Sequence, residues 1–389
     1  MSCNQDIYKR LGDYIQEVDV RNTESNVSKL VGLTIAKAFI PSVANTIGTD
    51  LSKYKIIKEN QFACSLMQVS RDGKMPIAIY KGEDAIMSPA YPIFEVCREG
   101  LLPDYLQMWF SRPEFDREAV FYAVGGVRGS LDWKDFMDMK LPIPEVAEQQ
   151  RIVDQYNAIQ KRIENNKQTI AKLEDAAQAI YRKMFVDDID PENLPEGWKI
   201  TPLENLCISV NSGSTPKNFI TDAALPTINY FKAESIDNGH FVDADALSKI
   251  DIEVHNSMKR SQIESGDILF SMAGTIGKFC IAENEHVPAN TNQAICVIRT
   301  DSSIINVNTL FSMFLCGVQE EYVIRNIQEG VQANLSLSNI RNMPILLPPD
   351  EILNKYEDMI GPLISYMRNL WKENQYLTNT KKLITANIV

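Results

Sequence analysis

The chain has 389 residues, of which 44% are apolar and 8% aromatic, and Asp and Glu outnumber Lys and Arg by 51 to 39. This composition suffices for two or three domains with buried cores and excludes wholesale disorder. The net charge of −12 argues against a protein that coats nucleic acid regardless of sequence, because such binding needs dense Lys and Arg. No apolar leader and no run of about 20 apolar residues are present, so we expect a cytoplasmic protein without a membrane span.

Motifs that carry chemistry are missing from the chain. The seven cysteines and three histidines have no metal-ligand or redox spacing, so we expect reduced cysteines and no metal site. The segment 274–278 resembles the tail of a phosphate loop, but Met272 and Phe279 stand where glycine and Ser/Thr are required. The glycine-rich dinucleotide motif, the nucleophile elbow and the Asn-Pro-Pro-aromatic tetrad of amino-methyltransferases are also absent. We therefore expect a non-catalytic chain that holds no cofactor.

The sequence contains one unit twice. Near the start of each copy the offset is 192 residues, and further on it is 204, so the second copy carries a net 12 extra residues in its front half. Such self-similarity indicates two structural repeats. Identical residues at the offset of 204 are Ala85/Ala289, Ala90/Ala294, Leu106/Leu310, Phe110/Phe314, Gly126/Gly330, Val127/Val331, Leu131/Leu335, Met139/Met343 and Pro144/Pro348.

Each copy begins with short strands and a helix. The strand segments are short, rich in β-branched or aromatic residues, and bounded by Gly, Pro, Asn or Asp. In the first copy we expect strands at Gln61–Val69, Ile77–Tyr80 and Tyr91–Val96 and a helix at Pro103–Arg112. In the second copy we expect strands at Asp267–Met272, Phe279–Ala282 and Ala294–Arg299 and a helix at Val307–Gln319.

A long helix is predicted to end each copy, at 145–185 and 349–389. In both segments apolar residues recur at alternating steps of four and three, as in the seam of a coiled coil. More than four heptads is long compared with an average helix of about 11–12 residues. Two amphipathic helices, each packed on its own domain, are the alternative. The acidic segment 186–198, with two prolines and a glycine, reads as a linker.

One asparagine lies in each apolar seam. Antiparallel, end-to-end pairing of the helices brings Asn166 opposite Asn374, where the amides can bond to each other, whereas a slipped register buries each amide against apolar groups. We expect this pair to set the register. Gly361 and Pro362 fall inside the second seam, so that helix should kink or restart near 359–363.

Together these patterns predict an α+β protein. Two α/β domains in a tandem pseudo-repeat, 1–144 and 199–348, are separated by the two long helices, which form an antiparallel coiled coil.

Short motifs follow one another in a fixed order along the two copies, most of them in the second. They are 194–198 (Leu-Pro-Glu-Gly-Trp), 212–217 (Ser-Gly-Ser-Thr-Pro-Lys), 266–271, 274–278 (Gly-Thr-Ile-Gly-Lys), 292–294 (Asn-Gln-Ala), and 141–144 with Glu148 and Gln149. With these motifs in this order, the chain resembles the specificity subunit of type I restriction-modification systems along nearly its whole length. The first copy departs from the pattern with 69–74 (Val-Ser-Arg-Asp-Gly-Lys) and 88–91 (Ser-Pro-Ala-Tyr), so its loops should meet DNA differently.

The resemblance implies two target-recognition domains, each reading one half of a bipartite, asymmetric sequence in double-stranded DNA. The helices would set the unread spacer and dock two methyltransferase subunits, which bring S-adenosylmethionine. Separate restriction subunits would bring ATP hydrolysis, Mg²⁺ and cleavage, and no membrane is involved.

Exposed loop cations, hydroxyls and amides are the side chains suited to phosphates and base edges. For any one of them, a solvated loop residue is the alternative. We expect DNA contacts from Lys37, Ser70, Arg71, Lys74, Arg128 and Ser130 in the first domain, and from Thr215, Lys217, Lys232, Lys278, Gln332 and Asn334 in the second.

Two other functions stay open on the sequence alone. A coiled-coil scaffold or adaptor for proteins agrees with the acidic charge. An enzyme, either a methyltransferase or a nuclease, agrees less well, because the motifs are missing and Asp350, Glu351 and Lys355 are too loosely arranged for a nuclease site. If the chain does read DNA, its charge predicts weak binding alone and tight binding only in an assembled complex.

Overall fold

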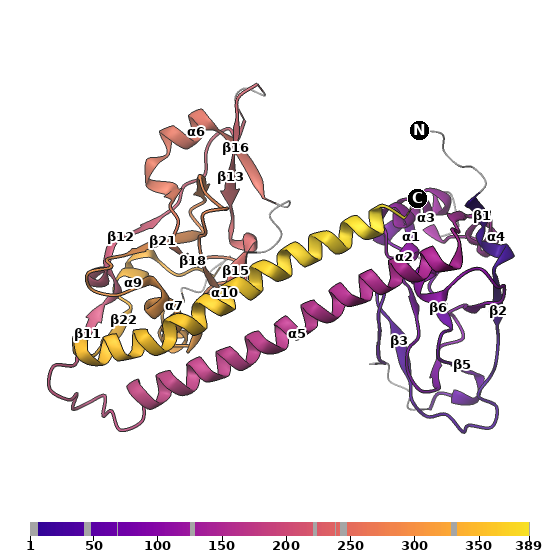
Figure 1. The fold of residues 1–389 in the computed structure, drawn as a ribbon, viewed down its shortest axis with the longest axis horizontal. Helices are drawn as coiled ribbons and strands as arrows, with labels where there is room; N and C mark the ends of the chain where they lie inside the picture. Colours follow the sequence, from indigo (N-terminus) through magenta and orange to yellow (C-terminus); the bar gives the residue numbers. More distant parts are fainter. Residues whose placement is uncertain are drawn as a thin grey trace. The chain divides into compact units, whose positions relative to one another are not determined.

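The computed structural model describes residues 7–42, 48–67, 69–124, 129–220, 224–237, 239–241, 247–327 and 333–388. The chain divides into two compact units. Unit 1 contains 1–162 and 377–389, and unit 2 contains 163–376. Each unit thus holds one globular domain and one end of both long helices (Figure 1).

The domain of unit 1 is built on an antiparallel sheet with the order β2-β9-β6-β7. The domain also contains three antiparallel strand pairs, β1-β10, β3-β4 and β5-β8. The strands are β1 (Tyr8–Arg10), β2 (Ile15–Val18), β3 (Val31–Leu33), β4 (Phe39–Pro41), β5 (Lys55–Ile57), β6 (Phe62–Cys64), β7 (Ile77–Ile79), β8 (Ala85–Met87), β9 (Ile93–Val96) and β10 (Lys140–Pro142). The helices are α1 (Val69–Asp72), α2 (Pro103–Phe110), α3 (Pro113–Ala123) and α4 (Trp133–Asp138).

The domain of unit 2 has two four-stranded sheets, β12-β21-β18-β19 and β16-β13-β20-β17. The first is antiparallel throughout, and in the second β13 and β20 run parallel. The strands are β11 (Lys199–Pro202), β12 (Cys207–Ser212), β13 (Thr227–Phe231), β14 (Ile236–Asp237), β15 (His240–Phe241), β16 (Ser248–Asp251), β17 (Gln262–Ile263), β18 (Ile268–Ser271), β19 (Phe279–Ile281), β20 (Ala289–Thr291), β21 (Ile295–Thr300) and β22 (Pro344–Leu347). The helices are α6 (Ile252–Ser257), α7 (Val307–Leu315), α8 (Glu320–Asn326) and α9 (Leu337–Arg341).

The two domains repeat the same scaffold. The order β2-β9-β6-β7 recurs as β12-β21-β18-β19, and the pair β1-β10 recurs as β11-β22. Even a loop contact is repeated, since the amide of Leu131 donates to the carbonyl of Leu66 (2.9 Å) and that of Leu335 to Met272 (2.8 Å). The predicted tandem pseudo-repeat of mixed helix and sheet is confirmed.

Two predicted elements end at least four residues earlier than expected. The strand predicted over Gln61–Val69 stops at Cys64. Val69 begins α1 instead, and its side chain is buried in the core from that helix. The helix predicted over Val307–Gln319 stops at Leu315, shortly before Gly317, which adopts a φ of 81°.

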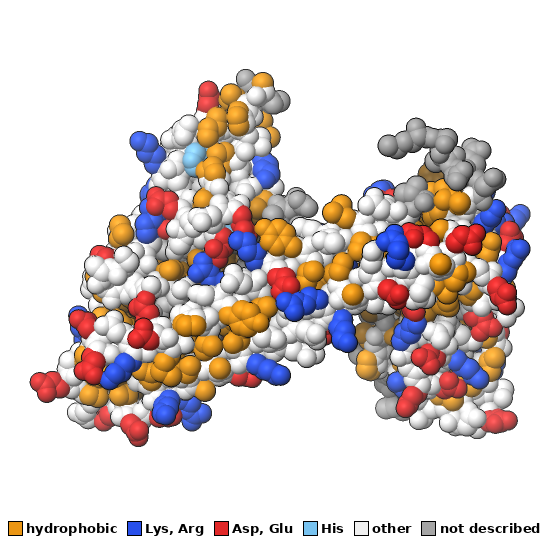
Figure 2. Space-filling view, viewed as in Figure 1, with side chains coloured by type: hydrophobic (Ala, Val, Ile, Leu, Met, Phe, Trp, Pro, Cys, Tyr) orange, Lys and Arg blue, Asp and Glu red, His pale blue; other side chains and the backbone are white. Residues whose placement is uncertain are grey.

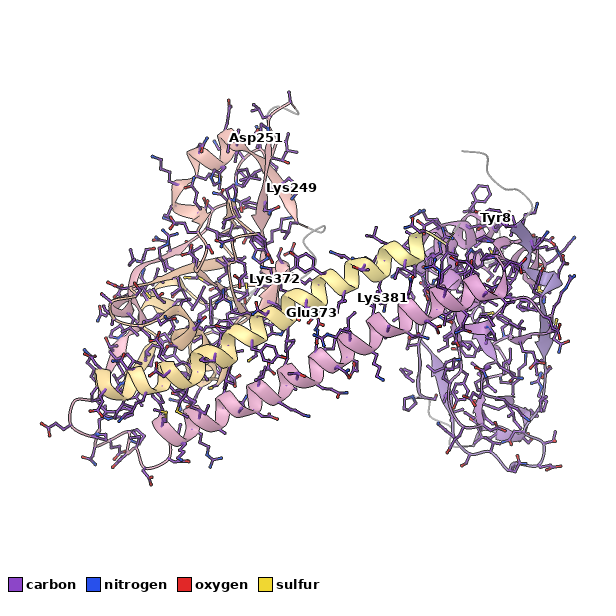
Figure 3. All side chains as sticks on the ribbon, in the orientation of Figure 1. Tyr8, Lys249, Asp251, Lys372, Glu373 and Lys381 are labelled. Carbon is purple, nitrogen blue, oxygen red and sulfur yellow. The ribbon has the colours of Figure 1, made fainter. Side chains whose placement is uncertain are left out.

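Two long helices complete the units, α5 (Val146–Phe185) and α10 (Asp350–Ala386). They run antiparallel within each unit. In unit 1 the Lys381 ammonium lies 4.6 Å from the centre of the Tyr156 ring, and in unit 2 the Phe185 and Tyr356 rings lie 4.8 Å apart. Lys381 and Glu373 lie along the side of α10 that contacts α5 (Figure 3).

The expected contact between the seam asparagines is present in unit 2. Asn166 Nδ2 donates to Asn374 Oδ1 and to Glu373 Oε2, both at 3.0 Å. Because the Asn166 side chain is buried, this bonding compensates a desolvated amide. The contact agrees with the proposed register, while its role in setting that register stays a prediction.

The helix does not restart at proline. α10 continues from Asp350 to Ala386 with Pro362 inside it. Pro362 and Asp358 are both exposed. The carbonyl of residue 358, which loses its helical partner, therefore lies on the solvent side, where water can satisfy it.

Candidate DNA interface

Three of the motif loops meet on the domain of unit 2. They are 212–217, which follows β12, 272–278, which joins β18 to β19, and 292–294, which joins β20 to β21. Backbone bonds connect them: Gly213 N–H donates to Ile295 O (3.1 Å), Ser214 N–H to Thr291 O (3.0 Å), and Met272 N–H to Ala294 O (2.7 Å). We call the surface formed by these three loops and 333–335 the motif strip.

Close packing explains the glycine in the first loop. A Cβ atom on Gly213 would lie 2.2 Å from the carbonyl oxygen of Asn292, so no other residue fits without moving the backbone. The next residue is held from below, because the buried Tyr230 hydroxyl donates to Ser214 O at 3.0 Å. The backbone of the motif strip is therefore fixed by the fold.

Several predicted contact residues lie on the motif strip. Thr215 and Lys217 are exposed on its first loop, and the Thr215 hydroxyl donates to Gln293 Oε1. Asn334 is exposed and forms a bridge with Ala273. The strip therefore presents a hydroxyl, an ammonium and two carboxamides, which are groups suited to phosphates and base edges.

The two other lysines predicted in this domain are only partly available for DNA contacts. Lys232 is half-buried, and its ammonium lies 5.9 Å from the centre of the Phe219 ring. Lys278 Nζ lies 2.6 Å from Asp237 Oδ1, so its charge is compensated inside the domain. Gln332 lies outside the described residues.

In unit 1 the predicted contact residues lie around α1. Arg71 keeps 65% of its side-chain surface and pairs with Asp72 at 2.8 Å, while Lys74 is exposed. Ser70 Oγ donates to Gly129 O (3.5 Å), and the neighbouring Ser130 is half-buried. Arg128 lies outside the described residues.

Lys37 differs from the expected exposed loop cation. Only 10% of its side-chain surface is exposed to solvent. Its ammonium pairs with Asp116 (2.8 Å) and donates to Phe110 O (2.5 Å), and it lies 5.0 Å from the centre of the Phe115 ring. Burial lowers the pKa of Lys37, and the pair with Asp116 opposes that shift. Lys37 thus ties the turn of the β3-β4 hairpin to the helices and is withdrawn from the candidate DNA contacts.

Arg260 is a site residue that the sequence did not point out. Its guanidinium donates to Ser212 Oγ (3.0 Å) and Ser212 O (3.4 Å), at the start of the motif strip. The consecutive Lys259 and Arg260, just before β17, are the signal that could have found it.

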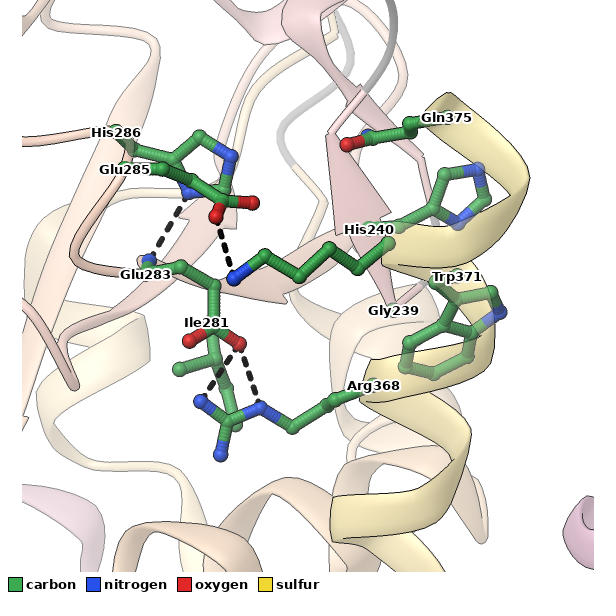
Figure 4. Close-up of a pocket in the computed structure, with 10 residues that line it drawn as sticks. Gly239, His240, Ile281, Glu283, Glu285, His286, Arg368, Trp371 and Gln375 are labelled. Atoms are coloured by element: carbon green, nitrogen blue, oxygen red, sulfur yellow. Dashed lines mark hydrogen bonds and ion pairs between the residues drawn. The ribbon is translucent and has the colours of Figure 1, made fainter. Parts of the chain in front are cut away.

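A cluster of charges lies where α10 meets the domain of unit 2 (Figure 4). Arg368 pairs with Glu283 at 2.6 Å, and Lys372 pairs with Glu285, which raises the pKa of Lys372. His286 is buried, and its ring Nδ1 accepts from the Glu283 amide (3.0 Å). The acidic and basic groups compensate each other, so this cluster docks α10 and is not a ligand site.

The distribution of surface charge agrees with DNA binding through a few side chains and not through a broad basic area. On the face seen in Figure 2, Lys and Arg alternate with Asp and Glu, and no large basic area appears. Within the described ranges no three His, Cys, Asp or Glu side chains group as metal ligands. None of the helices in the described part of the chain is long and apolar enough to cross a membrane.

Known proteins resemble this chain in sequence and fold. Residues 195–365 match the family described as the type I restriction modification DNA specificity domain. The MjaIX specificity subunit of Methanocaldococcus jannaschii is 22% identical over 311 residues, covering 75% of this chain and 69% of its own. The EcoBI specificity subunit of Escherichia coli is 25% identical over 273 residues, covering 62% and 55%.

One solved structure shares the fold along the full length. The S subunit of a type I restriction-modification system from M. genitalium matches with a TM-score of 0.57 at 13% identity, covering 100% of this chain and 98% of its own. At this identity the likeness concerns the fold alone.

Proposed function

We propose that the chain is a specificity subunit of a type I restriction-modification system and that each of its two domains reads one half of a bipartite target in double-stranded DNA. The observation that carries this proposal is the motif strip. Loops that lie far apart in the sequence are hydrogen-bonded into one surface that bears Thr215, Lys217 and Asn334. A fixed backbone with exposed donors and acceptors is what base readout requires.

We further propose that the chemistry belongs to partner subunits. In this proposal two methyltransferase subunits dock on the long helices and supply S-adenosylmethionine, and restriction subunits supply ATP, Mg²⁺ and cleavage, in the cytoplasm. The chain's net charge of −12 supports shared phosphate contacts, because an acidic protein alone binds DNA weakly.

The methylome of cells that express the full chain with its methyltransferase subunit tests the proposal. We expect methylated adenines within one bipartite, asymmetric motif. A continuous motif, or no motif, would contradict the proposal. The variant Gly213→Leu should abolish recognition of one half-site, because its side chain would displace the motif strip. Gly361→Ala is the control, since a Cβ atom there meets nothing within 4 Å.

The long helices are proposed to set the spacer between the half-sites. Seven residues added to each helix at matched positions lengthen it by about 10 Å. We then expect the unread spacer to grow by about three base pairs, at roughly 3.4 Å each, with both half-sites unchanged. A spacer of unchanged length would exclude this role.

A further inference from the structure

Gln293 stands on a hydrogen-bonded turn of the motif strip. The amide of Asn292 donates to Phe231 O (3.2 Å), and its side-chain Oδ1 accepts from the amide of Ala294 (3.2 Å). The carbonyl of Ala294 in turn accepts from Met272 (2.7 Å). The residues on both sides of Gln293 are thus fixed, while its own side chain is exposed.

The carboxamide of Gln293 has a defined orientation. The Thr215 hydroxyl, 78 residues away in sequence, donates to Oε1. Thr215 is itself positioned, because Ser214 bonds both to Thr291 and to the buried Tyr230 hydroxyl. An amide oxygen accepts two hydrogen bonds and an amide nitrogen donates two, so Oε1 retains one acceptor position beside the Nε2 donors.

That pairing matches one base edge in the major groove. Adenine presents N7 as an acceptor beside the N6 amino donor, and a glutamine reads both at once. Guanine presents two acceptors there, which suit two donors. With Thr215 bonded to Oε1, the carboxamide still presents an acceptor beside a donor, as the adenine edge requires.

The first repeat has no counterpart to this side chain. At the offset of 204 residues, Pro89 occupies the position of Gln293, and the matching turn is 88–91. Pro89 is exposed, and its side chain has neither donor nor acceptor. The same turn of the scaffold therefore carries a carboxamide at this position in the second repeat and none in the first.

On the basis of the proposed function, we propose that Gln293 is a specificity-determining residue that reads one adenine in the half-site of the second repeat. Thr215 acts through it as a positioning residue.

The methylome of the full chain with its methyltransferase subunit measures this role. Gln293→Ala should relax the preference at one position of one half-site by about tenfold to a hundredfold, the range for a bidentate contact. Gln293→Glu, which only accepts, should move that position towards cytosine. Thr215→Val should weaken the preference at the same position, and Thr215→Ser, which keeps the hydroxyl, should restore it. The control Ser302→Ala, at an exposed residue beyond the other end of β21, should leave both half-sites unchanged.

The outcomes separate this inference from the proposed function. If the unaltered chain directs no bipartite methylation, the proposed function fails. If it does, and Gln293→Ala keeps every base preference or only lowers overall methylation, base reading by Gln293 is overturned. Relaxation in the half-site that the first domain reads would overturn it as well. Thermal melting of the variants should match that of the unaltered chain, because Gln293 is exposed.

Discussion

The two repeats build one scaffold from different side chains. In unit 1 the sheet packs on a cluster of rings, in which Phe94 contacts Phe62 (5.1 Å), Phe136 (5.7 Å) and Trp133 (5.9 Å). In unit 2 the residue at the position of Phe94 is Ile298, which pairs with Ile268 on the neighbouring strand. Both are fully buried. The strand order requires apolar volume and not particular residues.

The surface loops diverge more than the cores. Where the second repeat has the loop 272–278, the first has the short helix α1 with Arg71, and Pro89 stands in the place of Gln293. The bond from Leu131 to Leu66, and its counterpart from Leu335 to Met272, persists under both. Under the proposed function, a shared scaffold with different loops would let the two halves of a target differ while the partner subunits stay the same.

The largest expected effect comes from the ring cluster. Phe94→Ala should lower the free energy of unfolding by about 3–5 kcal/mol, whereas Ile298→Val should cost about 0.5–1.5 kcal/mol. Hydrogen exchange resolved by peptide would locate each loss in its own unit. Equal losses in both units after Phe94→Ala would show that the units unfold together.

The next largest effect is expected from the ion pairs of α10, which differ in burial. In unit 2 the pair Arg368–Glu283 is largely buried, with 22% and 28% of the side-chain surfaces exposed. Arg368→Ala should cost about 1–3 kcal/mol, because Glu283 is left partly desolvated without its partner. Lys355→Ala, which breaks an exposed pair on the same helix, is the matched control and should leave the denaturation midpoint unchanged. Equal effects of the two variants would contradict this account.

The seam asparagines should affect specificity of pairing more than stability. Replacing both by leucine, Asn166→Leu with Asn374→Leu, removes the two bonded amides together, and the half-buried Glu373 can turn towards water. The free energy of unfolding should therefore change by at most about 1 kcal/mol. It should loosen the register, which cross-linking of cysteine pairs placed across the helices would detect. A single cross-linked register in the double variant would exclude a register-setting role.

The smallest effect is a pH dependence confined to unit 2. Burial lowers the pKa of His286, and its ring accepts a bond from the Glu283 amide, so the folded state favours the neutral ring. Below the ordinary pKa of about 6.5 the unfolded chain binds a proton that the folded chain does not. Stability should therefore fall as the pH drops from 7 through 6.5 towards the lowered pKa. His286→Gln should flatten this part of the stability curve, measured by denaturant unfolding between pH 5.5 and pH 7.

Parts of the site could be predicted and parts could not. The motif pattern located the loops around Thr215 and Asn334, because glycine and hydroxyl residues mark turns locally. It could not exclude Lys37, since the burial of that ammonium depends on Asp116 and Phe110, far along the chain. It passed over Arg260, and it marked 292–294 as a motif without singling out Gln293, because the roles of both residues come from contacts with Ser212 and Thr215.

The sequence by itself determined the repeat, the long helices and the opposition of Asn166 and Asn374, because periodicity is a local property that survives without knowledge of the packing. Only the tertiary structure decided which polar side chains are engaged and which face solvent. The reason is physical: Thr215 and Gln293 lie 78 residues apart, and they meet because β13, β20 and β21 bring their loops together. No pattern within either loop encodes that meeting.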